Sequence, residues 1–256
     1  LEGVPDPILH PLDNGWAGII DGIGGTGVVT IGAILGMAAH LEGRGCGMID
    51  MAGLAQKGGA VFSHVRIAAT PEDIHAIRVS AGKADLVLGC DLVVSGSSKV
   101  LAAVREGETE FVVNTAEVMP GDFTRDADFS LPSERIKRAI VKAAGSERTT
   151  FFDAALTANR LFGNAVAANM FMLGIACQRG ALPVSAGAVE KAIELNGQAV
   201  AMNIDAFRWG RRAAHEPEAV LALAGEAQNA ETASPQTPEE LIAHRARHLA
   251  TYQNAA

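Results

Sequence analysis

The segment Gly22–Gly27, with the sequence GIGGTG, is the strongest candidate for a ligand-binding site in the chain. Glycines permit positive φ angles and allow a ligand to approach the backbone closely. A helix that begins directly after the loop presents free backbone amides and the positive end of its dipole to an anion. The residues that we assign to this candidate cofactor-binding loop are Gly22, Gly24, Gly25, Thr26 and Gly27.

Two interpretations of this loop remain open from the residues alone. Asp50 ends the second expected strand, where a ribose-binding acid lies in a dinucleotide-binding fold, so a nicotinamide-binding domain is the default interpretation. The glycines are also compatible with a tight strand-to-helix turn that binds no ligand.

A second glycine-containing segment, LAQKGGA, lies at residues 54–60. Two consecutive glycines expose successive amides that form an anion-binding nest, and an adjacent lysine adds a positive charge. We therefore include this turn in the candidate cofactor-binding site, with the residues Gln56, Lys57, Gly58 and Gly59.

The range 61–67, VFSHVRI, alternates strictly and predicts a strand. Alternation places Phe62, His64 and Arg66 on one face of it and the intervening residues on the other. His64 and Arg66 are candidates for contact with a carboxylate or phosphate, the arginine through its planar fork. The alternative is a polar sheet face that is solvated or salt-bridged.

The remaining polar residues give weaker indications of function. Asp91 and Asn114 each follow an expected strand, where the loops of an α/β sheet build sites, but they are equally good helix caps and turn residues. Nothing places a base beside Ser63, and no paired-carboxylate, Ser/His/Asp or metal-ligand spacing stands out. Catalytic residues therefore stay unknown, and no metal site is predicted.

Apolar runs that alternate with helical patterns predict a parallel sheet covered on both faces. We expect a three-layer α/β/α fold with a mostly parallel, Rossmann-like sheet, followed by a helical C-terminal part. The strand at 61–67 is expected to be an antiparallel or edge insertion. The expected strands are 16–21, 46–50, 61–67, 85–90, 111–113 and 148–152, and the expected helices are 28–41, 133–144, 154–162, 165–179, 185–195 and 198–212.

Composition divides the chain into three parts and limits its partners. Prolines predict a linker over residues 1–15, the α/β domain covers 16–212, and 213–256 is a linker or frayed helix ending in a helix at 239–252. The net charge of −8 argues against a sequence-independent nucleic-acid binder. The three cysteines are too few and too dispersed for a disulfide scaffold or an iron–sulfur site, and they suggest buried residues in a reducing cytoplasm.

Neither a membrane segment nor a signal peptide is expected. The longest apolar runs, Val28–Leu41 and Ala165–Cys177, are shorter than the roughly 20 residues that span a bilayer. The first residues are proline-rich and acidic rather than basic and then apolar, and no methionine begins the chain. We therefore expect a cytoplasmic fragment or processed piece of a longer protein.

Four ordered stretches resemble the gamma domain of 2-oxoacid:ferredoxin oxidoreductases, above all the long fused indolepyruvate type of bacteria. The resemblance runs from residue 16 to 215, and the C-terminal sequence at 239–256 also resembles that type. The stretches begin with GIGGTGVVTIGAILG, DMAGLAQKGGAVFSHVRIA, NRLFGNAVAANMFMLG and ELNGQAVAMNIDAFRWG.

The resemblance implies one domain of an enzyme that oxidatively decarboxylates an aryl 2-oxoacid such as indolepyruvate. Thiamine diphosphate, Mg²⁺ and 4Fe–4S clusters are expected in other domains or subunits, with coenzyme A as co-substrate and ferredoxin as electron acceptor. This chain alone is expected to hold none of these groups and to be inactive. By the same resemblance, the Gly22–Gly27 loop and the turn at 56–59 face the assembled site.

Two hypotheses from other classes stay open beside this one. A free-standing NAD(P)-binding Rossmann oxidoreductase is suggested by the glycine loop together with Asp50. A non-catalytic module that binds a nucleotide or coenzyme A is suggested by the loop alone.

Overall fold

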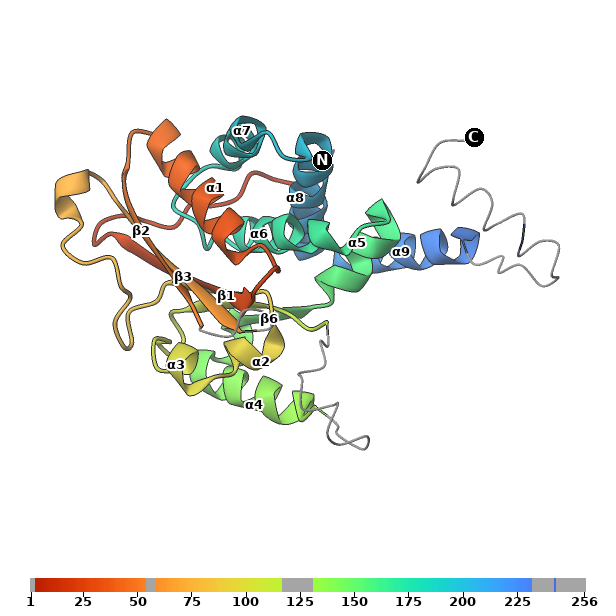
Figure 1. The fold of residues 1–256 in the computed structure, drawn as a ribbon, viewed down its shortest axis with the longest axis horizontal. Coiled ribbons are helices and arrows are strands. Elements are labelled where there is room, and N and C mark those ends of the chain that lie inside the picture. Colours follow the sequence, from red (N-terminus) through yellow and green to blue (C-terminus); the bar gives the residue numbers. More distant parts are fainter. Residues whose placement is uncertain (1–2, 54–58, 117–130, 232–241, 243–256) are drawn as a thin grey trace.

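A six-stranded sheet forms the centre of the molecule (Figure 1). The computed structural model describes residues 3–53, 59–116, 131–231 and 242. The strands follow the spatial order β2-β3-β1-β4-β5-β6. Their bounds are β1 Trp16–Ile23, β2 Gly45–Ala52, β3 Ala60–Ala68, β4 Leu86–Gly89, β5 Glu110–Asn114 and β6 Thr149–Phe152.

Helices cover both faces of this sheet, which confirms the three-layer α/β/α fold (Figure 1). The first layer contains α1 (Val28–Leu41), α6 (Ala168–Gln178), α7 (Ala186–Asn196) and α8 (Val200–His215). The second layer contains α2 (Leu92–Ser95), α3 (Ser98–Leu101) and α4 (Ser133–Ala144). The remaining helices are α5 (Ala154–Phe162), α9 (Pro217–Glu231) and the 3-10 turns η1 (Pro71–Asp73), η3 (Ser146–Arg148) and η4 (Ala165–Ala167).

The strand predicted as an antiparallel or edge insertion is antiparallel, but it does not lie at an edge. β3 pairs with β1 from Trp16↔Ile67 to Ile23↔Ala60, and its other side pairs with β2, which is the edge strand. The physical reason is that β3 buries residues on both faces, whereas much of β2 is exposed. The strands β1, β4, β5 and β6 pair in parallel.

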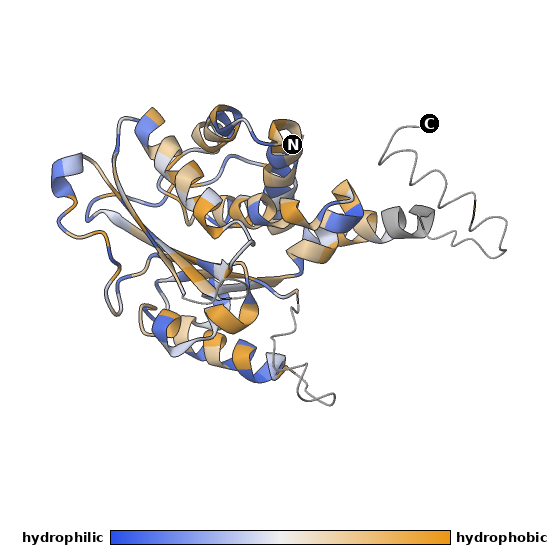
Figure 2. Ribbon diagram, viewed as in Figure 1, coloured by the Kyte–Doolittle hydropathy of each residue, from blue (hydrophilic) through white to orange (hydrophobic). Residues whose placement is uncertain are grey.

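Alternation along the strands separates two apolar clusters. In β1, Trp16 and Ile20 belong to the core under α1, α6, α7 and α8, while Ala17 and Ile19 face the opposite layer. Figure 2 shows hydrophobic segments on the strands and on the helices of both layers. None of the helices in the described part of the chain has the length and apolar character that a membrane crossing requires.

The helices α6 and α8 approach each other at backbone distance. A Cβ built on Gly210 would lie 1.9 Å from the carbonyl oxygen of Phe171, and one built on Gly174 would lie 2.0 Å from that of Phe207. Only glycine permits such an approach, so these two residues determine how tightly the first layer packs.

The segments on either side of the predicted domain pack against its helices. Residues 3–15 form no helix or strand, and the carbonyl oxygen of Pro5 accepts hydrogen bonds from Gln178 and Arg211. The stretch predicted to be a linker or frayed helix forms α9, which buries Val220 and contacts α5 and α8. Except for Ile242, the helix expected at 239–252 lies outside the described residues.

Candidate functional site

The glycine loop lies at the carboxyl end of the central strands. It connects β1 to α1 in the first helical layer, whereas the chain leaving β4 enters α2 in the second layer. Because β1 and β4 are parallel neighbours, their ends form a topological switch point. Open α/β sheets bind ligands in the crevice at such a point.

Backbone conformation and steric contact explain why glycine occupies three positions of the loop. Gly25 and Gly27 have φ angles of +101° and +81°, which favour glycine. A Cβ on Gly22 would lie 2.9 Å from the Cβ of Cys90, and one on Gly27 would lie 2.2 Å from Nδ2 of Asn169. The tight-turn interpretation therefore accounts for these three glycines.

The start of α1 is free to interact with an anion. Gly27 is its N-cap, no side chain caps the helix, and its first turn contains no acidic residue. Thr26 instead closes the loop, since its Oγ1 donates a hydrogen bond to the carbonyl oxygen of Ile23 at 2.7 Å. Among the described residues, no side chain compensates the first amides of α1 or the positive end of its dipole.

A cavity of about 230 Å³ opens beside this loop, and we call it the glycine-loop pocket. Asn114 joins three of its walls: Oδ1 accepts hydrogen bonds from the amides of Ala116 and Ala154, and Nδ2 donates to the carbonyl oxygen of Cys90. Ligand pockets are typically about 300 to 1,000 Å³, so this one fits a small group or one end of a larger ligand. Its other lining residues include Gly25, Thr26, Ala165, Val166, Asn169 and Met172.

Two buried acids lie on the second-layer side of the same strand ends. Ser95 Oγ is 2.7 Å from both Asp21 Oδ1 and the carbonyl oxygen of Asp91. A hydroxyl has one hydrogen, so Ser95 donates to only one of these two acceptors at a time. Burial raises the pKa of Asp21 well above its usual value, and the hydrogen bond from Ser95 opposes that shift.

Asp91 is the N-cap of α2, where its Oδ1 accepts a hydrogen bond from the amide of Val94 at 2.9 Å. Burial raises the pKa of this carboxyl as well. The helix-cap interpretation of Asp91 is therefore confirmed. The sequence analysis overlooked Asp21, although a lone acid at an inward-facing position of the buried run WAGIIDGI is a detectable sign of a buried carboxyl.

The second glycine-containing segment adjoins the first. The amide of Gly24 donates a hydrogen bond to the carbonyl oxygen of Gly59 at 3.1 Å, because β3 begins beside the end of β1. Gln56, Lys57 and Gly58 lie outside the described residues.

His64 and Arg66 share a face of β3 with Phe62, as alternation predicts, but neither lines the glycine-loop pocket. His64 is 4% exposed, and its Nδ1 accepts a hydrogen bond from the amide of Val79 at 2.9 Å. Burial, with the charges of nearby Lys99, Arg78 and Arg66, lowers the pKa of His64 to about 4, so the ring is neutral at pH 7. The polar-face alternative therefore fails at His64, which is buried. Arg66 is half-buried, and its Nε has no hydrogen-bond partner among the described residues.

Asp50 does not lie where a dinucleotide would need it. It belongs to the edge strand β2 and is exposed, and β3 separates its strand from β1. In dinucleotide-binding folds the ribose-binding acid follows the strand next to the glycine loop strand. The added strand moves Asp50 away by roughly 5 Å, the usual spacing between strands.

The cysteines do not fit the ligand set of an iron–sulfur cluster. Such clusters are held by four thiolates, whereas Cys46, Cys90 and Cys177 lie on β2, after β4 and in α6, and all three are free. Cys90 and Cys177 are buried and Cys46 is half-buried. In the described part of the chain, no three His, Cys, Asp or Glu side chains gather closely enough to hold a metal ion.

The fold and the glycine loop define an α/β domain of the Rossmann-like class. Within that class, the chain belongs to the pyruvate ferredoxin/flavodoxin oxidoreductase family, whose pattern matches residues 18–213.

Relatives and solved structures agree with this assignment. Indolepyruvate oxidoreductase subunit IorB of Methanothermobacter thermautotrophicus is 29% identical over 197 residues, and these residues make up 76% of this chain and 95% of that protein. The subunit of the same name from Pyrococcus horikoshii is 30% identical over 200 residues, which cover 77% and 95% of the two chains.

Two solved structures share the fold. The gamma subunit of a keto/oxoacid ferredoxin oxidoreductase from Geobacter sulfurreducens superposes with a TM-score of 0.55 at 24% identity, over 78% of this chain and 98% of that one. The 2-oxoglutarate:ferredoxin oxidoreductase of Magnetococcus marinus gives a TM-score of 0.57 at 17% identity, over 78% of this chain but only 31% of that one. The predicted resemblance to the gamma domain is thereby confirmed.

Proposed function

We propose that this chain is the gamma component of a 2-oxoacid:ferredoxin oxidoreductase that oxidatively decarboxylates an aryl 2-oxoacid such as indolepyruvate. Thiamine diphosphate, Mg²⁺ and 4Fe–4S clusters belong to other subunits or domains of the cytoplasmic enzyme. Coenzyme A accepts the acyl group, and ferredoxin accepts the electrons. The proposal rests on family membership and on the similarity of the chain to the indolepyruvate oxidoreductase subunits IorB.

One structural observation supports a role for this chain beside other protein components. Exposed apolar side chains lie in η4, which lines the glycine-loop pocket, and in the first turns of α1, α2 and α5, which follow the parallel strands β1, β4 and β6. Exposed apolar side chains at one edge of a sheet favour coverage by a partner protein. We call this group the rim; it consists of Val29, Val93, Leu156 and Val166, of which Val166 lines the pocket.

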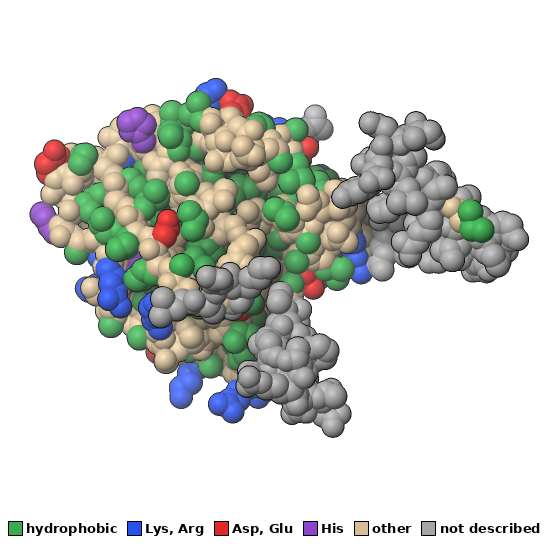
Figure 3. All heavy atoms as spheres, in the orientation of Figure 1, with side chains coloured by type: hydrophobic (Ala, Val, Ile, Leu, Met, Phe, Trp, Pro, Cys, Tyr) green, Lys and Arg blue, Asp and Glu red, His purple; other side chains and the backbone are tan. Residues whose placement is uncertain are grey.

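The distribution of side chains on one face of the molecule supports the same proposal. On the face seen in Figure 3, hydrophobic side chains are scattered across the centre, while charged side chains lie mostly at the margin. Depletion of charge at the centre of a surface is typical of protein interfaces. A partner that covers the rim would complete the small pocket and exclude water from it.

The chain supplies positioning rather than electron transfer in this proposal. Its cysteines do not fit a cluster, and the start of α1 offers amides to an anionic group of the substrate or of coenzyme A. The matched turn at 56–59 would contribute further amides and a lysine to the same group. We therefore expect the isolated chain to be inactive.

The rim gives a direct test. Val166 is 64% exposed, so Val166→Glu should leave the chain folded but weaken its assembly with the thiamine- and cluster-containing components by about tenfold or more. Leu195→Glu is the matched control, because Leu195 is 55% exposed on α7 and does not line the pocket. Assembly is measured by co-purification, and activity by dye reduction with indolepyruvate, thiamine diphosphate and coenzyme A.

Two outcomes would contradict the proposal. An intact native enzyme that has no cluster absorbance and reduces no dye with indolepyruvate is not an oxidoreductase of this type. Binding of NADH to the isolated chain, followed by fluorescence up to about millimolar concentration, would instead support the free-standing dehydrogenase. The position of Asp50 on the outer strand speaks against that result.

A further inference from the structure

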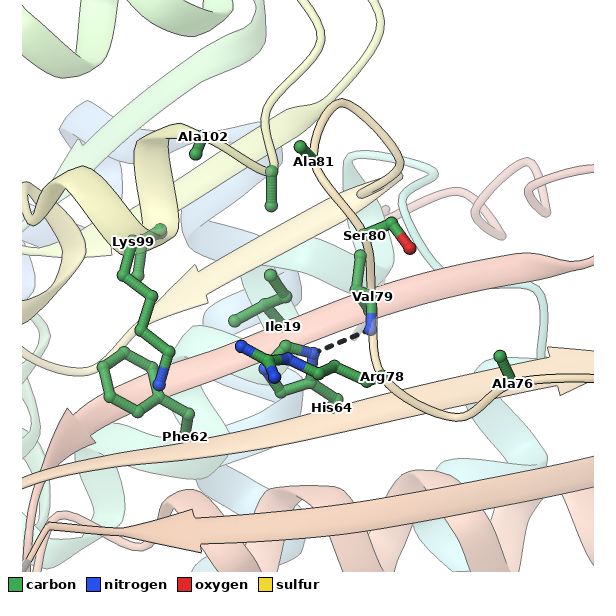
Figure 4. Close-up of a pocket in the computed structure, with 12 residues that line it drawn as sticks. Ile19, Phe62, His64, Ala76, Arg78, Val79, Ser80, Ala81, Lys99 and Ala102 are labelled. Carbon is green, nitrogen blue, oxygen red and sulfur yellow. Dashed lines mark hydrogen bonds between the residues drawn. The ribbon is translucent and has the colours of Figure 1, made fainter.

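A larger cavity lies on the other side of β1 and β3, facing the second helical layer (Figure 4). Its volume is about 540 Å³, and we call it the β3 cavity. Ile19 and Phe62 form its floor, Val79 lies at one side, and Val100 also lines it. It shares no lining residue with the glycine-loop pocket.

The charged groups of the β3 cavity are all positive. Arg78 approaches from the segment before β4 and Lys99 from α3, and no acidic residue lines the cavity. Within the described ranges, neither cation forms an ion pair. In a chain with a net charge of −8, two unpaired cations at one cavity create a local field opposite to that of the whole molecule.

His64 adds a directed hydrogen-bond donor between these cations. Its Nδ1 accepts from the amide of Val79, so the neutral ring carries its hydrogen on Nε2. Nε2 has no hydrogen-bond partner among the described residues. Figure 4 shows His64 on the floor of the cavity with Arg78 beside it.

The rest of the lining is apolar. The ammonium of Lys99 lies 3.8 Å from the centroid of the Phe62 ring, which holds the charge at the cavity wall instead of in bulk water. The remaining wall consists largely of alanine and valine side chains. A ligand that fits this surface combines an anionic group with a compact apolar or aromatic body.

We propose that the β3 cavity is a second binding site, separate from the glycine loop, for an organic anion whose phosphate or carboxylate contacts Arg78, Lys99 and His64. The concave shape and apolar floor favour a small molecule over the flat surface of a protein. Two sources supply this chemistry: the phosphates of a nucleotide such as coenzyme A, and the carboxylate of an aromatic 2-oxoacid.

Calorimetric titration of the 256-residue chain at low ionic strength tests the site. Three probes are used separately: inorganic phosphate, coenzyme A and indolepyruvate. The double variant Arg78→Gln and Lys99→Gln should weaken binding by about tenfold or more, because each charged hydrogen bond lost to an anion is a strong one. The matched control is Arg135→Gln with Lys142→Gln, which removes two exposed cations of α4 outside the cavity.

A second measurement does not depend on the variants. The ring ¹⁵N resonances of His64 should shift when a probe that binds is added. Those of His40 should not shift, because His40 is exposed at the end of α1 in the opposite layer. Coenzyme A binding with a phosphate-induced shift assigns the phosphate source, and indolepyruvate binding alone assigns the carboxylate source.

The proposal is overturned if no probe binds at about 10 mM, or if the double variant binds as tightly as the wild type. It is also overturned if the control pair weakens binding equally, since that result indicates general charge attraction. Because the titration uses this chain without other components, its outcome is independent of whether the assembled enzyme oxidises indolepyruvate.

Discussion

The two faces of the sheet are built in different ways. Four helices of eleven to sixteen residues seal the first face, and the core beneath them is apolar. The second face is covered by two four-residue helices and by α4, and it buries Asp21, Asp91 and His64. The short helices of the second face leave room for these polar groups and for the β3 cavity.

The first face mainly stabilises the fold, whereas the second face holds buried titratable groups. The first face stabilises the fold by burying apolar surface and by close helix contact. On the second face, buried titratable groups cost free energy unless they are hydrogen-bonded and neutral. Burial raises the pKa of Asp21 and lowers that of His64 to about 4, and both shifts favour the uncharged form of the buried group.

The contact between α6 and α8 should be the most sensitive point of the first face. Gly210→Ala places a Cβ against the backbone of Phe171, which cannot move without separating the helices, so we expect a loss of at least about 3 kcal/mol. Gly225→Ala is the control, because nothing lies within 4 Å of its added Cβ and helix propensity should give a gain of about 0.5 to 1 kcal/mol. Urea denaturation measures both changes, and an unchanged midpoint for Gly210→Ala would rule out the close approach.

The pH dependence of stability should reveal His64 on the second face. Its folded pKa of about 4 is below the unfolded value of 6.5, so the stability that it contributes is present above pH 6.5 and is lost as pH falls toward 4. The loss should reach at most about 3 kcal/mol. We expect it in urea titrations of the wild type and of His40→Gln, but not of His64→Gln. Parallel curves for all three proteins would contradict a buried, neutral His64.

Asp21 should give a smaller effect of opposite sign. Its pKa is raised in the folded state by burial, so its contribution is present below the unfolded value near 3.8 and is lost as pH rises toward the folded value. Relative to wild type, Asp21→Asn should therefore gain stability as the pH is raised from about 4 toward 7. Asp6→Asn, at an exposed position of the N-terminal segment, is the control. A constant difference between Asp21→Asn and wild type over this range would show that Asp21 is ionised.

Much of the architecture was predictable because it depends on local patterns. Alternation along 61–67 placed Phe62 and His64 on one face, and the glycine loop marked the junction of β1 and α1. The inner position of β3 was not predictable. Two paired strands can join a sheet through either strand, and the sequence does not show that β3 pairs with β1 while β2 lies at the edge. The sequence left α9 open between a linker and a frayed helix, because its polar, alanine-rich sequence becomes stable only by packing against α5 and α8.

The candidate sites were predictable only where their residues lie close in sequence. The loop and turn glycines were found, whereas Arg78 and Lys99 come from a segment without regular structure and from a four-residue helix. Their proximity to His64 depends on how these segments cover β3, and no periodicity in the sequence encodes that. The hydrogen bond that Asp21 accepts depends in the same way on Ser95, which lies 74 residues further along the chain.

The antiparallel direction of β3 has a consequence for how the family can vary. Because β2 and β3 pair in antiparallel, the end of β2 and the start of β3 lie together beside the glycine loop: the amide of Gly53 donates to the carbonyl oxygen of Ala60, and that of Gly24 to Gly59. Adding or removing one residue pair at this end of the two strands preserves the inward and outward alternation of every residue below it. The length of the strand pair beside the glycine loop can therefore evolve in steps of one pair, while the residues that line the β3 cavity keep their orientation.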